Sequence, residues 1–344
     1  MNRSSSIKAL VPMACCIFAV NCLSQANPFV GDWALTLYGN VGIGSSAGWL
    51  EVRQEQGFLD ADLLWRWGSV EPVASVLMHE GKLIVTRTWS LERKKDDSGK
   101  ILKAHNLTSW FECELAGDDA MFGKALLPDG KGLVVETVRF TGKRMPAVPP
   151  APDLSKKKYG KPVKIFNGKD LAGWTLVNPK DVNGWQVQDG VLVNDPVQKE
   201  GQPHIPYGNL RTVDAFEDFN LKLEVNIPKG SNSGIYLRGK YEVQIADSYG
   251  NPLDSHNMGA VYSRVAPSVA AEKPAGEWQT LDITLCERHV IVVLNGVKII
   301  DNKPIGGITG GALCPDATAP GPVYLQGDHG KVLYRNIVLT PIVK

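Results

Sequence analysis

Residues 232–250, NSGIYLRGKYEVQIADSYG, carry functional side chains at two-residue intervals. Tyr236 and Arg238 form one pair, and Glu242 and Gln244 form another. Side chains two residues apart in a β-strand point to the same face, so the members of each pair share a face. A phenol, a guanidinium, a carboxylate and an amide can bind a polar ligand or transfer protons. We therefore expect this stretch to present a binding or reactive surface on a sheet.

A second stretch, YLQGDHG at residues 324–330, has the same character. Gln326 and Asp328 share a face and could contact the hydroxyl groups of a ligand, although Asp328 could equally cap a turn. His329 follows directly, and imidazole changes its charge near neutral pH. Glycines on either side of the Asp–His pair allow the backbone to approach a ligand closely. These two stretches are where we expect the function to lie.

Glu242 and His329 are the two candidate catalytic residues. We expect Glu242 to act as a general base or as a metal ligand, and the alternative is a structural ion pair with Arg238. His329 is expected to act in acid–base catalysis or as a metal ligand, and the alternative is a solvated turn histidine. Both are candidate ligands for a divalent cation, but no diagnostic metal spacing is present, so the need for a metal cofactor stays open.

Three further residues are expected to bind the substrate if the two stretches converge. Asn209, Tyr236 and Tyr262 are placed as pocket lining beside Arg238 and Gln244.

The composition is that of an ordinary globular protein with many turns. The chain has 344 residues, 43% hydrophobic and 21% charged, and its net charge of +1 gives no reason to expect nucleic acid as a partner. The contents of 35 Gly and 22 Pro favour an all-β fold. Residues 1–26 have a short basic region, an apolar run and a small-residue end, which predicts a signal peptide cleaved after Ala26. That apolar run is too short to span a membrane, and no other long apolar segment follows.

A proline-rich and lysine-rich segment, MPAVPPAPDLSKKKYGK at residues 145–161, predicts a semi-rigid linker. It separates residues 27–144 from residues 162–344. The first part has short alternating strands, typical of a small antiparallel barrel or sandwich, and we derive no chemistry from it. Its tryptophans are more easily explained by core packing than by sugar binding. They are Trp65, Trp67, Trp89 and Trp110.

The second part is also rich in strands. Residues 219–227 alternate, and Asn295-Gly296 separates two apolar runs, which is a strong signal for a two-residue hairpin. Because strands recur with Gly and Pro between them and no long helical period appears, two packed antiparallel sheets are expected. A length of about 180 residues favours a jelly roll over an immunoglobulin-type sandwich.

Residues 162–344 resemble the 3-keto-disaccharide hydrolase domain family along nearly their whole length. The similarity rests on FNGKDLAGW (residues 166–174), GNLRT (208–212), the stretch around Glu242, GAVYSRVAPSVAAEKPAGEWQTLDI (259–283) and PGPVYLQGDHGKVLYRNI (320–337). The resemblance implies a concanavalin A-like jelly roll in a secreted or periplasmic bacterial protein of carbohydrate metabolism. It implies nothing about residues 27–144.

The activity implied by the resemblance is cleavage of a glycosidic bond in a sugar oxidised to a ketone at carbon 3. The ketone acidifies the hydrogen on carbon 2, so that a base can remove it and the aglycone on carbon 1 can leave. Water then adds to the enone, which gives net hydrolysis. The alternative is a carbohydrate-binding module without catalysis. A conventional glucanase is disfavoured, because the strand of Glu242 carries Gln244 where a second carboxylate would be expected.

Overall fold

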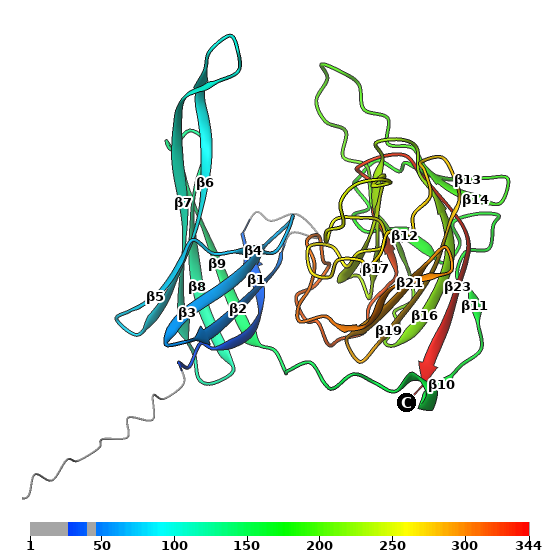
Figure 1. Cartoon of the computed structure of the whole chain (residues 1–344), viewed down its shortest axis with the longest axis horizontal. Helices are drawn as coiled ribbons and strands as arrows, with labels where there is room; N and C mark the ends of the chain where they lie inside the picture. Colours follow the sequence, from blue (N-terminus) through cyan, green and yellow to red (C-terminus); the bar gives the residue numbers. More distant parts are fainter. Residues whose placement is uncertain (1–26, 40–45, 344) are drawn as a thin grey trace, which may run out of the picture.

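The computed structural model describes residues 27–39 and 46–343, so the expected signal peptide lies outside the described residues. The described chain folds as strands, with one 3-10 turn, η1 (Leu154–Lys156), which confirms the all-β prediction. The strands form two bodies, one from each half of the chain (Figure 1). No helix in the described ranges is long and apolar enough to cross a membrane.

Residues 31–144 form one antiparallel sheet of nine strands in the described part of the chain. The sheet curls on itself. Val73 N donates a hydrogen bond to Ala61 O (3.1 Å), and Ala74 N donates one to Thr86 O (2.7 Å), so the connection between the two edge strands joins both edges. Of the two architectures expected here, the barrel is the one formed. In order across the sheet, the strands are β4 (Glu71–Pro72), β3 (Phe58–Trp65), β2 (Ala47–Glu55), β1 (Gly31–Tyr38), β9 (Val135–Arg144), β8 (Ala120–Pro128), β7 (Ile101–Leu115), β6 (Lys82–Lys95) and β5 (Ser75–His79).

Strands β1, β2 and β3 are buried on both faces. Trp33, Leu50 and Leu63 lie in register across the three strands and fill the barrel core. The next row, Ala34, Trp49 and Leu64, points the other way and belongs to the core of the second body. This double burial covers only part of each strand: apolar residues are consecutive at 33–35, 49–50 and 63–65, whereas the rest of β2 and β3 alternates apolar and charged residues.

The second body is a sandwich of two antiparallel sheets, as predicted. The Asn295-Gly296 hairpin is confirmed, because both residues adopt positive φ angles (51° and 82°) between β20 and β21. The larger sheet contains β13 (Trp185–Gln188), β14 (Val191–Asn194), β23 (Val332–Val343), β16 (Phe219–Asn226), β19 (Gln279–Cys286), β20 (His289–Leu294) and β21 (Val297–Pro304), with β10 (Lys158–Tyr159) and β11 (Val163–Lys164) on β23. The smaller sheet contains β12 (Trp174–Leu176), β15 (Leu210–Thr212), β22 (Tyr324–Leu325), β17 (Asn232–Leu237) and β18 (Tyr241–Ala246).

Residues 145–161 lie along the sandwich and are not a bare spacer. They contain η1 and β10, and the carbonyls of Pro146 and Pro152 accept hydrogen bonds from Arg288 (2.7 Å) and Asn302 (3.1 Å). The prolines remove N–H donors but leave these carbonyls free to bind side chains of the second body. The predicted linker therefore contains short regular elements and is bonded to the sandwich.

Trp49 is the centre of the contact between the barrel and the sandwich. The Arg264 guanidinium lies 4.2 Å from the centroid of its ring. On another side, Gly307 packs so closely that an added Cβ would lie 2.3 Å from Trp49 Nε1. A single methyl group added at position 307 would therefore disturb the contact between the two bodies.

This fit predicts different effects for two neighbouring glycines, neither of which has left-handed backbone. Gly307→Ala should lower the free energy of unfolding by about 1–3 kcal/mol, because the methyl group overlaps the indole of Trp49. Gly306→Ala is the matched control, since its Cβ would meet nothing within 4 Å. Urea denaturation of both variants measures the difference. Equal stability of the two variants would show that the contact at Trp49 is loose.

Candidate functional site

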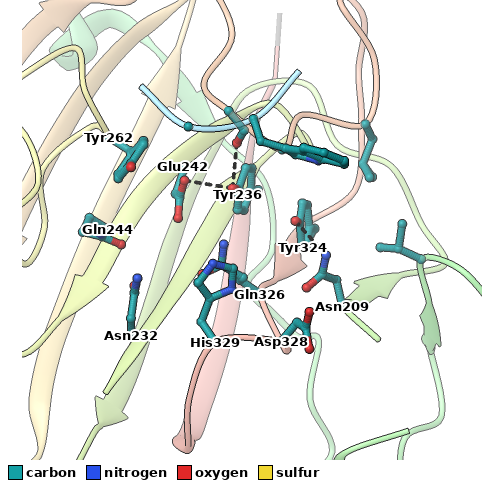
Figure 2. Close-up of a pocket in the computed structure, with 16 residues that line it drawn as sticks. Asn209, Asn232, Tyr236, Glu242, Gln244, Tyr262, Tyr324, Gln326, Asp328 and His329 are labelled. Carbon is teal, nitrogen blue, oxygen red and sulfur yellow. Dashed lines mark hydrogen bonds between the residues drawn. The ribbon is translucent and has the colours of Figure 1, made fainter. Parts of the chain in front are cut away.

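A pocket of about 390 Å³ opens over the smaller sheet of the sandwich (Figure 2). It gathers eight of the nine residues that the sequence singled out as catalytic or substrate-binding. These are Asn209, Tyr236, Glu242, Gln244, Tyr262, Gln326, Asp328 and His329. The two stretches singled out in the sequence therefore converge on one site.

The register of the smaller sheet places these side chains on one face. Tyr236 on β17 pairs with Glu242 on β18, and Gly234 pairs with Gln244. On its other edge, β17 pairs with β22, with Tyr236 opposite Tyr324. Cross-strand partners point to the same side, so the two tyrosine rings stack, with centroids 4.0 Å apart and planes 11° apart.

Gly234 makes room for the Glu242 side chain. A Cβ at position 234 would lie 2.2 Å from Glu242 Oε1, so any other residue there would displace the carboxyl group. The absence of a side chain on one strand therefore lets the carboxyl group of the next strand lie flat across the sheet.

Glu242 is a buried acid. The residue is 4% exposed, and this burial raises the pKa of its carboxyl group to about 8. The Tyr236 hydroxyl lies 2.8 Å from Glu242 Oε2 and 2.7 Å from the carbonyl oxygen of Gly310. A phenol has one proton and can donate to only one of two acceptors. Both contacts are hydrogen bonds when Tyr236 donates to the carbonyl and Glu242 carries its own proton, in agreement with the raised pKa.

His329 lies at the mouth of the pocket. Two contacts fix the carboxylate of its neighbour, Asp328. Asp328 accepts hydrogen bonds from Tyr207 N (3.0 Å) and lies 3.0 Å from His204 Nε2. The pKa of His329 is lowered from its ordinary value, mainly because the pocket walls displace water around the ring, and Asp328 only partly opposes this. His329 is nevertheless an exposed residue. At neutral pH the ring is an uncharged base.

Amide groups complete the polar wall. Asn232 Oδ1 and Gln326 Oε1 are buried and have no hydrogen-bond partner within the described residues. Asn209 is fixed at both ends, since its amide donates to Tyr324 (3.0 Å) and accepts from Gly327 N (2.8 Å). Buried acceptors without a protein partner are costly unless a ligand or water donates to them. The wall is thus suited to a ligand with several hydroxyl groups.

Arg238 lies outside the pocket, although the sequence placed it with the substrate-binding residues. β17 ends at Leu237, and Arg238 has a positive φ of 55° at the start of the hairpin turn, so the two-residue alternation stops there. Its guanidinium binds Asp218 and the carbonyl of Glu217. The alternative of an ion pair with Glu242 is also wrong, because Glu242 bonds to Tyr236 instead.

The sequence analysis missed three of the polar or aromatic residues that line the pocket. Asn232 and Tyr324 begin the two strand-like stretches, and their alternation with the chosen residues could have included them. Trp67 belongs to the barrel, where core packing was expected. Trp65 meets that expectation with 9% exposure, but Trp67 is 61% exposed and lines the pocket. Trp89 and Trp110 are also exposed, which corrects the expectation for them.

In the described part of the chain, no three His, Cys, Asp or Glu side chains gather in a group that could hold a metal ion. Glu242, Asp328 and His329 all line the pocket, but in the described residues they do not gather into such a group. The residues present therefore do not fit a metal centre of protein ligands.

A sequence profile of the family described as the 3-keto-alpha-glucoside-1,2-lyase-like domain matches residues 161–340. The chain belongs to this family. The matched range contains both strand-like stretches and every pocket residue except Trp67 and Gly68. Membership in the 3-keto-alpha-glucoside-1,2-lyase-like family confirms the resemblance found in the sequence.

Individual relatives are more distant. The chain is 25% identical to a 3-keto-disaccharide hydrolase of Bacteroides thetaiotaomicron over 167 residues, which cover 40% of this chain and 57% of the relative. It thus spans little more than half the length of that curated relative. Two crystal structures of candidate glycosyl hydrolases from Parabacteroides distasonis are 24% and 28% identical, with TM-scores of 0.43 and 0.42. They match 53% and 56% of this chain and 94% and 92% of their own.

The buried acid predicts a specific dependence of stability on pH. The pKa of Glu242 is higher in the folded chain than in the unfolded chain, so its contribution to stability is complete at low pH and is lost as the pH rises towards about 8. Glu242→Gln removes this term while keeping a partner for Tyr236. Relative to the wild type, the variant should gain on the order of 1 kcal/mol per pH unit between about pH 5 and about pH 8.

Urea denaturation across that pH range measures the difference between the two proteins. Because other titrating groups are common to both, they cancel in the comparison. A difference that stays constant with pH would mean that Glu242 is ionised in the folded protein.

Proposed function

We propose that this protein cleaves the glycosidic bond of 3-keto-glycosides by elimination followed by hydration. The observation that carries this proposal is that one pocket holds both a buried carboxyl group, whose pKa is raised, and an imidazole, whose pKa is lowered. Family membership supports the same substrate class. The pocket differs from that of ordinary glycosidases, where two carboxylates act on an oxocarbenium-like state. Here Gln244 occupies the place beside Glu242 on its strand.

We change the role of Glu242 from the general base or metal ligand expected from the sequence to the acid, and we take the acid–base role of His329 to be that of the base. A carboxyl group with a pKa of about 8 is mostly protonated at neutral pH, so Glu242 serves as the acid. His329, whose pKa is lowered, serves as the base. In the elimination, His329 removes the proton on carbon 2 of the sugar. The bond from carbon 1 to the aglycone oxygen then breaks, and Glu242 gives its proton to that oxygen.

Hydration uses the same pair in reverse. After the elimination Glu242 is a carboxylate and His329 is an imidazolium. Glu242 takes a proton from water as the water oxygen adds to carbon 1 of the enone. His329 returns a proton to carbon 2, so both residues regain their starting states. The side-chain amides of the pocket supply N–H groups for the keto oxygen, where negative charge develops.

We also propose that the protein is exported, because residues 1–26 have the pattern of a signal peptide. The substrate pool is then extracellular or periplasmic. Amino-terminal sequencing of the protein recovered from the cell envelope or medium should find a chain that starts at Asn27. A chain that starts at Met1 in that fraction would contradict the proposal.

The acid and base assignments predict a bell-shaped pH profile for kcat/KM. Activity should fall above about pH 8 as Glu242 loses its proton, and should fall at acid pH as His329 becomes charged. Glu242→Gln and His329→Ala should each lower kcat/KM at least about 100-fold. The residual activity of His329→Ala should lack the acid limb. His79→Ala, an exposed histidine on the barrel, is the matched control.

Retained turnover in both variants would overturn the assignment of the site. A basic limb that persists in Glu242→Gln would assign that limb to another group.

The mechanism also predicts selectivity for the oxidised sugar. A 3-keto-glucoside should release its aglycone, whereas the parent glucoside should not, because only the ketone acidifies the hydrogen on carbon 2. Both substrates are incubated with the enzyme, with and without a chelator, and aglycone release is measured. Equal cleavage of the parent would refute elimination. Loss of activity with the chelator would show a metal requirement that the described side chains do not explain.

A further inference from the structure

One short segment of the barrel reaches the pocket. Residues 66–70 follow β3, and Trp67 and Gly68 are among the residues that line the pocket. In Figure 2 this part of the chain is the pale blue ribbon that crosses the pocket beside Tyr236. The barrel lies outside the range matched by the family profile, so the family gives this segment no role.

The segment is attached to the pocket at its first half by backbone contacts. Gly311 N donates a hydrogen bond to Arg66 O (3.4 Å). Gly310 packs on Gly68 so closely that an added Cβ would lie 2.2 Å from Gly68 O. Gly310 is the residue whose carbonyl holds the Tyr236 hydroxyl. The segment therefore lies against the tyrosine end of the pocket.

Side chains attach its second half. Ser69 Oγ lies 2.9 Å from His256 Nε2, and Val70 N donates to Ser263 Oγ (3.0 Å). Four of the five residues are thus fixed to the sandwich, and Trp67 stands between fixed neighbours on both sides. Arg66 and Gly68 both have positive φ angles (69° and 79°), which turn the chain sharply on either side of Trp67.

Trp67 belongs to neither hydrophobic core. Trp65, two residues earlier, packs edge-on against Phe111 in the barrel core, with ring centroids 4.9 Å apart. The turn carries Trp67 out of that core and leaves its indole 61% exposed at the pocket. A large apolar surface in water is unfavourable, and covering it with a ligand recovers that free energy.

We propose that Trp67 is the aromatic wall on which a sugar ring of the substrate packs, so that the barrel completes the substrate site. This rests on the proposed function. The apolar C–H face of a sugar ring fits an indole face, while its hydroxyl groups meet the amides of Asn232 and Gln326 on the sheet. A pocket with one aromatic wall and one polar wall orients a flat, amphipathic ring between them.

The test compares Trp67→Ala with Trp110→Ala, in full-length protein. Trp110 is the matched control, since it is 48% exposed on the barrel and lies outside the pocket. Turnover of a 3-keto-glucoside gives kcat and KM, and calorimetry with the unoxidised parent glucoside gives binding without reaction. Stacking acts equally on bound substrate and transition state, so Trp67→Ala should raise KM about tenfold with kcat changed less than about twofold. Trp67→Phe should recover part of the loss, and the pH profile should not move.

The outcomes separate this inference from the proposed reaction. If the wild type is active and Trp67→Ala behaves like Trp110→Ala, the aromatic wall is wrong and the reaction stands. If the wild type does not turn over the keto-glucoside but binds glucoside in a Trp67-dependent way, the reaction is wrong and the wall stands. A wild type that neither binds nor cleaves overturns both. A pH profile shifted by Trp67→Ala would mean that Trp67 acts through the acid, which also overturns the wall.

Discussion

The hydrogen bonds of the Tyr236 hydroxyl connect the parts of this structure on which the site depends. On one side the hydroxyl meets Glu242, and on the other it meets the carbonyl of Gly310. The first contact is possible because β17 and β18 pair with Tyr236 opposite Glu242. The second contact is to the loop of Gly310, which also packs against Gly68 of the barrel. The Tyr236 hydroxyl therefore links the register of the sheet, the buried acid and the loop on which the barrel segment packs.

Glycines make the close contacts around this hydroxyl possible. Gly234 leaves space for the Glu242 carboxyl group, and Gly310 allows the backbone of the barrel segment to approach. Gly311 is equally tight, since its Cβ would lie 2.8 Å from the Tyr236 hydroxyl. A side chain at any of these positions would separate groups that now touch. These glycines are thus as necessary to the geometry of the site as the residues with functional side chains.

The sequence predicted what depends on local pattern. Alternation located the strands of the site, and Asn295-Gly296 located a hairpin, because both follow from backbone geometry over a few residues. Arg238 was misplaced because the alternation was continued through a turn. Trp67 was missed because the contacts that hold its segment come from residues nearly two hundred positions further along the chain, with His256 at Ser69 and Ser263 at Val70. No local pattern reports a contact of that range.

The position of Arg238 also explains why the pKa of Glu242 is raised. Had the guanidinium reached Glu242, the opposite charge would have lowered the pKa of the carboxyl group and kept it ionised. The turn instead directs Arg238 to Asp218, and no cation contributes to the pKa of Glu242, which is set by burial and by Tyr236. A buried carboxyl group without a cationic partner is stable only in its protonated form. The turn that ends the strand at Leu237 therefore keeps this cation away from the Glu242 carboxyl group, so that burial raises its pKa.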